Sequence, residues 1–150
     1  MAKTYPDTPD PRGSFESIEA GTGFMPKFDA GGLLPAIVTE DGTGQVLMFA
    51  HMNGEAMQRT LATGEVHFWS RGRKKIWKKG EESGNILKVV EILTDCDQDV
   101  LWIKATVAGR GVTCHTGAKS CFYRRLVPGQ GTADVQHLEF VAAQNPIQGK

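Results

Sequence analysis

Residues that could bind metals are concentrated in one stretch of this chain, from Asp95 to Cys121. All three cysteines of the protein lie in this stretch, together with three aspartates at alternate positions and one of the four histidines. Thiolates are soft metal ligands and carboxylates are hard ones. The stretch therefore offers ligands for two different metals, and we expect the rest of the chain to position them and to bind a substrate.

The spacing of Cys96, Cys114 and Cys121 differs from the paired C-x-x-C of zinc ribbons and fingers. Three thiolates without a fourth cysteine suit a catalytic zinc site, which keeps one position open for water. His115 adjoins Cys114, and neighbouring side chains of an extended segment point to opposite faces. We therefore expect His115 beside the metal, as general base or proton shuttle. The alternative is three unrelated buried cysteines, which are common in protein cores.

The carboxylates of Asp95, Asp97 and Asp99 would share one face of an extended segment. They repel one another unless a cation lies among them. Calcium-binding EF-hand loops also begin with Asp-x-Asp-x-Asp, but here Val100 replaces the glycine and Thr106 the glutamate that such loops require. The pattern favours magnesium, which typically uses one or two carboxylates, water and substrate phosphate. The alternative is a solvated acidic turn.

A basic run follows the predicted strand at 66–70, and six of the nine residues from Arg71 to Lys79 are basic. Arginine forks and lysine charges suit phosphate oxygens, which indicates a phosphate cradle. The alternatives are a solvated charged face or a surface that binds RNA. Trp69 or Trp77 could stack on a base, although aromatic residues in strands more often belong to the core.

The composition is that of an ordinary globular protein. The 150 residues suffice for one domain with a core, and the formal net charge is zero. A neutral chain has no global field that attracts nucleic acid or membranes, and no run approaches the roughly 18 apolar residues of a membrane span. The N-terminus lacks an apolar signal segment, and an odd number of cysteines argues against a disulfide framework. We expect a cytoplasmic protein without nucleic-acid or membrane partners.

Proline, glycine and polar residues dominate both ends of the chain. We predict an irregular N-terminal arm (1–32), a core domain (33–127) and an irregular C-terminal tail (128–150). The arm is either a disordered tail or a segment that wraps a partner subunit. Strands are predicted in the core at residues 34–39, 46–51, 66–70, 86–94, 100–107 and 122–126, and residues 112–114 are expected to return the chain after a turn at 109–111.

One helix is predicted from Gly54 to Thr63, with Asn53 as its N-cap and Gly64 as its C-terminal stop. Its buried stripe should consist of Ala56, Met57, Thr60 and Leu61. Several strands joined by tight turns, with one main helix, predict an α+β fold with a mostly antiparallel sheet.

The cysteine and aspartate motifs together resemble one known family. Asp95-Cys96-Asp97-x-Asp99 and Cys114-His115-Thr116-Gly117-x-x-Ser120-Cys121-Phe122 are similar to motifs of phosphoribosyl-AMP cyclohydrolase, an enzyme of histidine biosynthesis. Further segments agree, among them Phe68-Trp69-Ser70-Arg71 and Lys79-Gly80-Glu81-x-Ser83-Gly84. The resemblance covers the chain from about Leu33 to Leu126.

The resemblance implies a hydrolase that opens the adenine ring of phosphoribosyl-AMP at the N1–C6 bond. It implies a homodimer with zinc sites at the subunit interface, where Cys96 of one subunit joins Cys114 and Cys121 of the other. Asp95, Asp97 and Asp99 would hold magnesium, and His115 would be the catalytic base. We expect the substrate-binding residues to be Arg71, Arg73, Lys75, Trp69 and Ser83.

The chain departs from the commonest family pattern at three peripheral positions. Asn85 stands in place of a frequent histidine, His51 in place of tyrosine, and Gly72 in place of serine. Some relatives carry a fused pyrophosphohydrolase domain, which we do not expect here because only a short segment follows Leu126. Two other functions compete with the enzyme: a zinc-stabilised module that binds RNA or nucleotide through residues 71–79, and a thiol redox protein. No two cysteines are close in sequence, which disfavours the latter.

Overall fold

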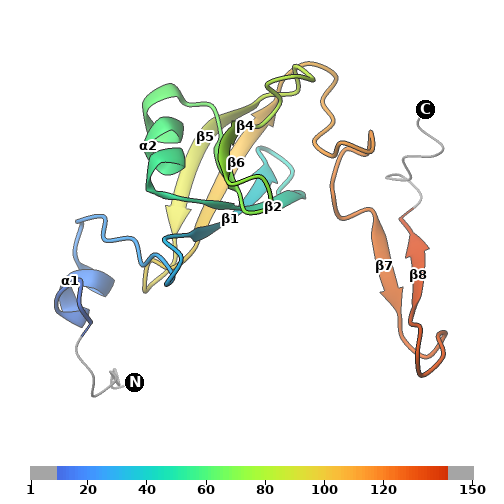
Figure 1. The fold of residues 1–150 in the computed structure, drawn as a ribbon, viewed down its shortest axis with the longest axis horizontal. Helices are drawn as coiled ribbons and strands as arrows, with labels where there is room; N and C mark the ends of the chain where they lie inside the picture. Colours follow the sequence, from blue (N-terminus) through green and yellow to red (C-terminus); the bar gives the residue numbers. More distant parts are fainter. Residues whose placement is uncertain (1–9, 142–150) are drawn as a thin grey trace.

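The computed structural model describes residues 10–141, and a four-stranded sheet forms its centre (Figure 1). The strand order is β2 (Val46–Met52), β1 (Leu34–Glu40), β6 (Leu101–Val107) and β5 (Leu87–Thr94). Neighbouring strands are antiparallel except β1 and β6, which run parallel. The α+β fold is therefore confirmed, with a mixed sheet in which antiparallel pairs predominate.

One face of the sheet is buried beneath α2 (Gly54–Thr63) and a two-stranded sheet of β3 (His67–Ser70) and β4 (Lys75–Lys78). Alternate residues of each central strand point to this side because successive side chains of a strand face opposite ways. The resulting core includes Leu34, Ala36, Val38, Leu47, Met52, Ala56, Phe68, Leu101 and Ile103, all at most 3% exposed. The basic run thus contains a strand, β4, that was not predicted.

The predicted helix is confirmed at both ends. The Asn53 side chain accepts a hydrogen bond from the Ala56 amide at 2.8 Å, and Gly64 adopts a left-handed φ of 71°. Ala56 and Thr60 are buried as expected. The prediction that Leu61 belongs to the buried stripe is wrong, because Leu61 is 58% exposed. Leu61 lies beside Phe24 at the edge of the helix, where the covering is incomplete.

Both chain ends contain structure in regions predicted to be irregular. Helix α1 (Phe15–Ala20) forms in the arm, where the Ser14 side chain caps it by accepting the Ser17 amide at 3.1 Å. In the tail, β8 (His137–Phe140) pairs with β7 (Arg124–Val127). This hairpin extends away from the central sheet (Figure 1). None of the helices in the described part is long and apolar enough to cross a membrane.

Residues 112–114, expected to return the chain after the turn at 109–111, are not part of a strand. The chain turns back on itself at this point. The amides of Thr113 and Cys114 donate to the carbonyls of Lys119 and Ala118, each at 3.1 Å. The segment is therefore a narrow loop, and this loop carries two of the three cysteines.

Candidate functional site: a thiol-lined basic cleft and a separate acidic turn

A cleft of about 740 Å³ opens between β2, the β3–β4 hairpin and two loops, at residues 79–85 and 110–121. Cys114, Cys121 and His115 line it. So do all five residues predicted to bind substrate: Trp69, Arg71, Arg73, Lys75 and Ser83. Residues up to 52 positions apart in sequence, from Trp69 to Cys121, thus meet at one cavity.

The loop that carries Cys114 and Cys121 is fastened to β2 at its far end. The Ser120 hydroxyl donates to the Val46 carbonyl at 2.7 Å, and the Cys121 amide donates to the Leu47 carbonyl at 2.8 Å. Gly117, at the tip, donates its amide to the Cys114 carbonyl at 3.1 Å. These bonds fix both cysteines at the wall of the cleft.

The two thiols of this loop are neighbours with different acidities. Burial raises the pKa of Cys114, but hydrogen bonds from Thr116 outweigh this effect and lower it, with the Thr116 hydroxyl 3.0 Å from the sulfur. Burial of the Cys121 thiol and the adjacent Cys114 raise the pKa of Cys121 to about 11, although the residue as a whole is exposed. The pair shares a hydrogen bond, and Cys114 is the thiol that ionises first. Adjacent sulfurs of this kind suit a soft cation such as zinc.

His115 lies at the tip of the loop, exposed and on the wall of the cleft. It follows Cys114 directly, and both residues line the same cleft. That His115 lies next to a metal at these sulfurs stays a prediction. Its exposure leaves the residue accessible to solvent.

The cleft contains cationic residues that sequence reasoning did not single out. Lys79 and Arg110 line it in addition to the three predicted cations. Burial lowers the pKa of Lys79, while the cysteines Cys121 and Cys114 oppose that shift, which places the ammonium near both thiols. Arg110 is held by its backbone, whose amide donates to the buried Asn85 side chain at 2.8 Å. Lys79 belongs to the basic run from 71 to 79, which indicated a phosphate-binding surface. Arg110 lies outside that run, and no sequence motif pointed to it.

The two candidate aromatic residues differ in their surroundings. Trp69 lines the cleft and is half-buried. Trp77 also borders the cleft, but its ring packs against buried Phe68 with centroids 5.1 Å apart. Trp69 is therefore the better placed of the two to meet a ligand.

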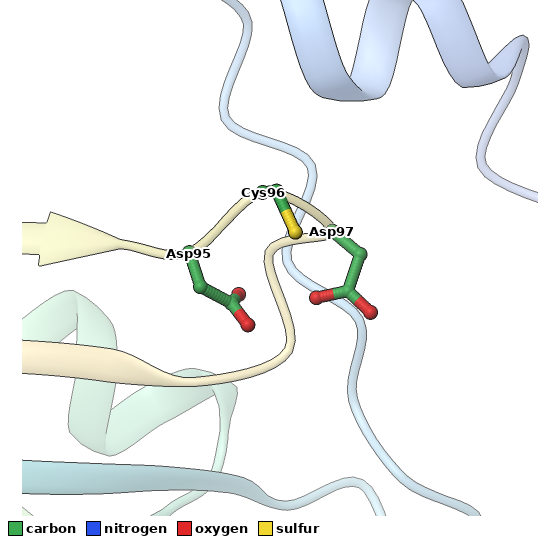
Figure 2. Close-up of side chains that lie close together, drawn as sticks. All are labelled: Asp95, Cys96 and Asp97. Atoms are coloured by element: carbon green, nitrogen blue, oxygen red, sulfur yellow. The ribbon is translucent and has the colours of Figure 1, made fainter. Parts of the chain in front are cut away.

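The acidic residues form a turn between β5 and β6, drawn in Figure 2. Ligand atoms of Asp95, Cys96 and Asp97 all lie within 4.8 Å of one another. The pKa of Asp99 is raised to about 6 by burial and by hydrogen bonding and repulsion from Asp95 and Asp97. Three carboxyl groups so close together hold a shared proton or a cation, and their hard oxygen atoms fit a divalent ion such as magnesium.

The turn and the thiol pair lie at opposite ends of β6. That strand has seven residues and spans about 20 Å. Figure 1 shows the β5–β6 turn at one end of the strands of the sheet and the segment after β6 at the other end. Within residues 10–141 of one chain, Cys96 is therefore brought to the aspartates but not to Cys114 or Cys121.

The fold and the cleft define a small α+β protein with a thiol pair, a histidine and several cations around one cavity. The family model for phosphoribosyl-AMP cyclohydrolase matches residues 48–123, which include the candidate residues from Trp69 to Cys121. Proteins named phosphoribosyl-AMP cyclohydrolase from Brucella canis and Brucella anthropi are 60% identical over 116 residues, 77% of this chain and 84% and 82% of theirs. One from Brucella abortus is 62% identical over 107 residues, 71% of this chain and 90% of its own. The chain belongs to the phosphoribosyl-AMP cyclohydrolase family.

Proposed function

We propose that this chain is an enzyme of histidine biosynthesis that hydrolyses the N1–C6 bond of the adenine ring in phosphoribosyl-AMP. The observation that carries the proposal is the single cleft that Cys114, Cys121 and His115 line together with the cations Arg71 and Arg73. A substrate with two phosphate groups and a base needs cations at its ends and a hydrolytic centre between them. The family relationship supports the same reaction.

His115 would act as the general base in this reaction. The imidazole takes a proton from the attacking water, whose oxygen forms a bond to C6. The C6–N1 bond then breaks, and N1 receives a proton, so the ring opens without loss of ammonia. The ribosyl group on N1 makes the ring cationic and C6 more electrophilic, which helps the attack.

Zinc is the cofactor that the thiols would hold, with Cys114 and Cys121 as two of its ligands and Cys96 as a third. When bound, it supplies an activated water for hydrolysis. The Thr116 hydroxyl, 3.0 Å from the Cys114 sulfur, would orient that ligand and favour its thiolate. Asp95, Asp97 and Asp99 would hold magnesium.

Substrate phosphates would bind along the basic wall of the cleft. Arg71, Arg73 and Lys75 project from the β3–β4 hairpin and its connection. Arginine forks pair with phosphate oxygens, and lysine adds a point charge. Trp69 would contact the base or sugar, and Ser83 would donate a hydrogen bond from the opposite loop.

A homodimer would bring Cys96 of one subunit to Cys114 and Cys121 of the other. Two observations support this assembly. The first is an apolar row across the outward face of the sheet, where Phe49, Ile37, Trp102 and Leu93 are cross-strand neighbours. Phe49, Ile37 and Trp102 are 48%, 36% and 42% exposed, although a row of this kind is normally covered.

The second observation is the β7–β8 hairpin. Leu126, Leu138 and Phe140 are 67%, 44% and 39% exposed on it. A two-stranded hairpin is marginally stable alone in water and gains stability by packing on another surface. A second copy of the chain would provide that surface and cover both apolar regions.

Ring opening is tested by mixing zinc-loaded protein with phosphoribosyl-AMP and magnesium and following the purine ultraviolet absorbance. Wild type should turn over substrate, and Cys114→Ser should not. Arg71→Ala should raise KM, whereas Arg59→Ala, which removes an exposed arginine of α2 that pairs with Glu55, should change neither KM nor kcat. No turnover by folded, zinc-loaded wild type would contradict the proposal and favour a module that binds nucleotide or RNA. Unchanged KM and kcat in Arg71→Ala would remove that residue from the substrate site.

A further inference from the structure

The N-terminal segment runs alongside the acidic turn, and this segment precedes the part of the chain that the family model matches. Figure 2 shows it, in blue, passing the loop that carries Asp95, Cys96 and Asp97. Asp95 and Cys96 are exposed. Within the turn, the amides of Asp99 and Gln98 donate to the side chain and the carbonyl of Asp95, at 3.1 and 3.2 Å. Further contacts come from the arm.

Gln98 is the centre of these contacts. It is 5% exposed, and its backbone has a left-handed φ of 58°. Residues other than glycine rarely adopt this conformation. Its side-chain oxygen accepts the Met25 amide at 2.6 Å, and its side-chain nitrogen donates to the carbonyls of Ile18 at 2.9 Å and Gly23 at 3.4 Å. Its own carbonyl accepts the Lys27 amide at 2.7 Å. One residue of the turn is thus bonded to four residues of the arm.

Arg12 holds the same turn from the other side. Its Nη1 donates to the Asp97 carbonyl at 2.8 Å and to the Met25 carbonyl at 2.6 Å. Nε and Nη2 donate to the Asp10 carboxylate, both at 2.9 Å. The Arg12 and Asp10 side chains are only 15% and 7% exposed. A guanidinium whose three nitrogens all donate to partners on the chain is a rigid brace rather than a mobile surface charge.

We propose that Arg12 and Gln98 are positioning residues that preorganise the acidic turn for its cation and present Cys96 in a fixed place. The inference rests on the proposed function, because it assumes that this turn binds magnesium. Ligands whose backbone is already held in place lose less entropy when the ion binds. Removing an outer-shell partner of metal ligands typically weakens binding by about 10- to 100-fold.

Arg12 allows a test that separates geometry from charge. In Arg12→Lys the charge stays but the fork that spans Asp97, Met25 and Asp10 is lost, whereas Arg12→Ala removes both. A brace predicts that Mn²⁺, used as a spectroscopic probe for the magnesium site, binds about tenfold more weakly to both variants. A purely electrostatic role predicts unchanged binding in Arg12→Lys and tighter binding in Arg12→Ala, since a repelling cation has gone.

The experiment uses the full chain and compares these variants with Arg59→Lys, in which an exposed arginine of α2 is changed. Mn²⁺ affinity is measured by paramagnetic resonance, and amide exchange of residues 95–99 is measured in the metal-free protein. We expect faster exchange in Arg12→Lys with an unchanged unfolding midpoint, and no change in Arg59→Lys. Unaltered exchange and affinity in Arg12→Lys would overturn the positioning role alone. A wild-type chain that binds no Mn²⁺ would overturn the proposed magnesium site, and with it this role.

Discussion

Thr113 carries a hydroxyl that is buried and has no hydrogen-bond partner within residues 10–141. A buried polar group without a partner loses its hydration and gains nothing in return, at about 1–3 kcal/mol. Valine has nearly the same shape without the hydroxyl. Thr113→Val should therefore raise the free energy of unfolding, by about 1 kcal/mol, in urea titrations.

Thr60 provides the matched control for that prediction. It is equally buried, but its hydroxyl donates to the Ala56 carbonyl at 2.8 Å and accepts the His67 amide at 3.0 Å. Thr60→Val leaves the buried His67 amide unpaired and should lower the free energy of unfolding by about 1–3 kcal/mol. Equal losses in both variants would mean that the Thr113 hydroxyl does have a partner.

At the scale of elements, the cysteine loop is tied to β1 by a single ion pair. The Lys119 ammonium lies 2.9 Å from the Glu40 carboxylate, and hydrogen bonds from Thr43 and Lys119 lower the pKa of Glu40 below its usual 4.5. A lowered carboxyl pKa stabilises the fold above the unfolded-state pKa, and the effect disappears as the pH falls through the folded-state value.

Glu40→Gln should therefore lower the free energy of unfolding at pH 7 by about 0.5 kcal/mol, since both side chains are partly exposed. The difference from wild type should shrink in unfolding curves recorded at decreasing pH below 4.5, as the pH falls through the lowered pKa of Glu40. Arg125→Gln is the control, because its ion pair with Glu139 in the β7–β8 hairpin is longer, at 3.6 Å, and more exposed. A Glu40→Gln difference that persists at low pH would rule out the ion pair as its cause.

The loop opposite the cysteines depends on close backbone packing at Gly80. It has a φ of +84°, and a Cβ there would lie 2.3 Å from the Asn85 carbonyl carbon. Gly84, in the same loop, has a φ of +81° but no atom within 4 Å of its Cβ position. Gly84→Ala should cost about 1 kcal/mol from backbone strain alone, and Gly80→Ala about 4 kcal/mol because it adds a collision. Similar thermal midpoints for the two variants would contradict this packing.

Local signals predicted some elements well and others not at all. The helix from Gly54 to Thr63 was predicted because its caps, Asn53 and Gly64, are encoded beside it. Residues 112–114 were expected only to return the chain, and hydrogen bonds to residues 118 and 119 fold this segment into a narrow loop that was not predicted. Such bonds depend on how the chain turns, which residue types alone do not determine.

The candidate site could be predicted only where the types of its residues indicate their chemistry. Cysteines, alternate aspartates and the basic run are visible in the sequence, and the cleft contains the basic residues and two of the cysteines. Arg110 and the anchors of the arm were not predicted, because their roles come from contacts such as the one between Arg12 and Asp97, 85 positions apart. No repeat or motif at Arg12 or Asp97 indicates in the sequence that the two residues are in contact.

For the whole molecule, the rigid sheet determines which groups can meet. β6 separates the acidic turn from the thiol pair by about 20 Å, and a paired central strand cannot bend enough to join them. A zinc site with Cys96 as a ligand therefore requires two chains. In a two-fold dimer each copy would give Cys96 to one site and Cys114 with Cys121 to the other.

Subunit mixing tests this arrangement directly. Cys96→Ser and Cys114→Ser homodimers should both be inactive, because each lacks one ligand at both sites. A heterodimer of the two variants has one site with both changes and one site with all three cysteines intact. Refolding an equimolar mixture should therefore restore about one quarter of wild-type turnover, since half of the dimers are mixed and each has one intact site.

The matched control is a mixture of Cys114→Ser and Cys121→Ser, whose cysteines come from the same chain in every site. Each mixed site then lacks one ligand, so this mixture should remain inactive. Bound zinc, measured in parallel, should follow the same pattern as turnover. If the first mixture also stayed inactive while its chains formed mixed dimers, the zinc ligands would not be shared between subunits, and Cys96 would have to act only with the aspartates of its own turn.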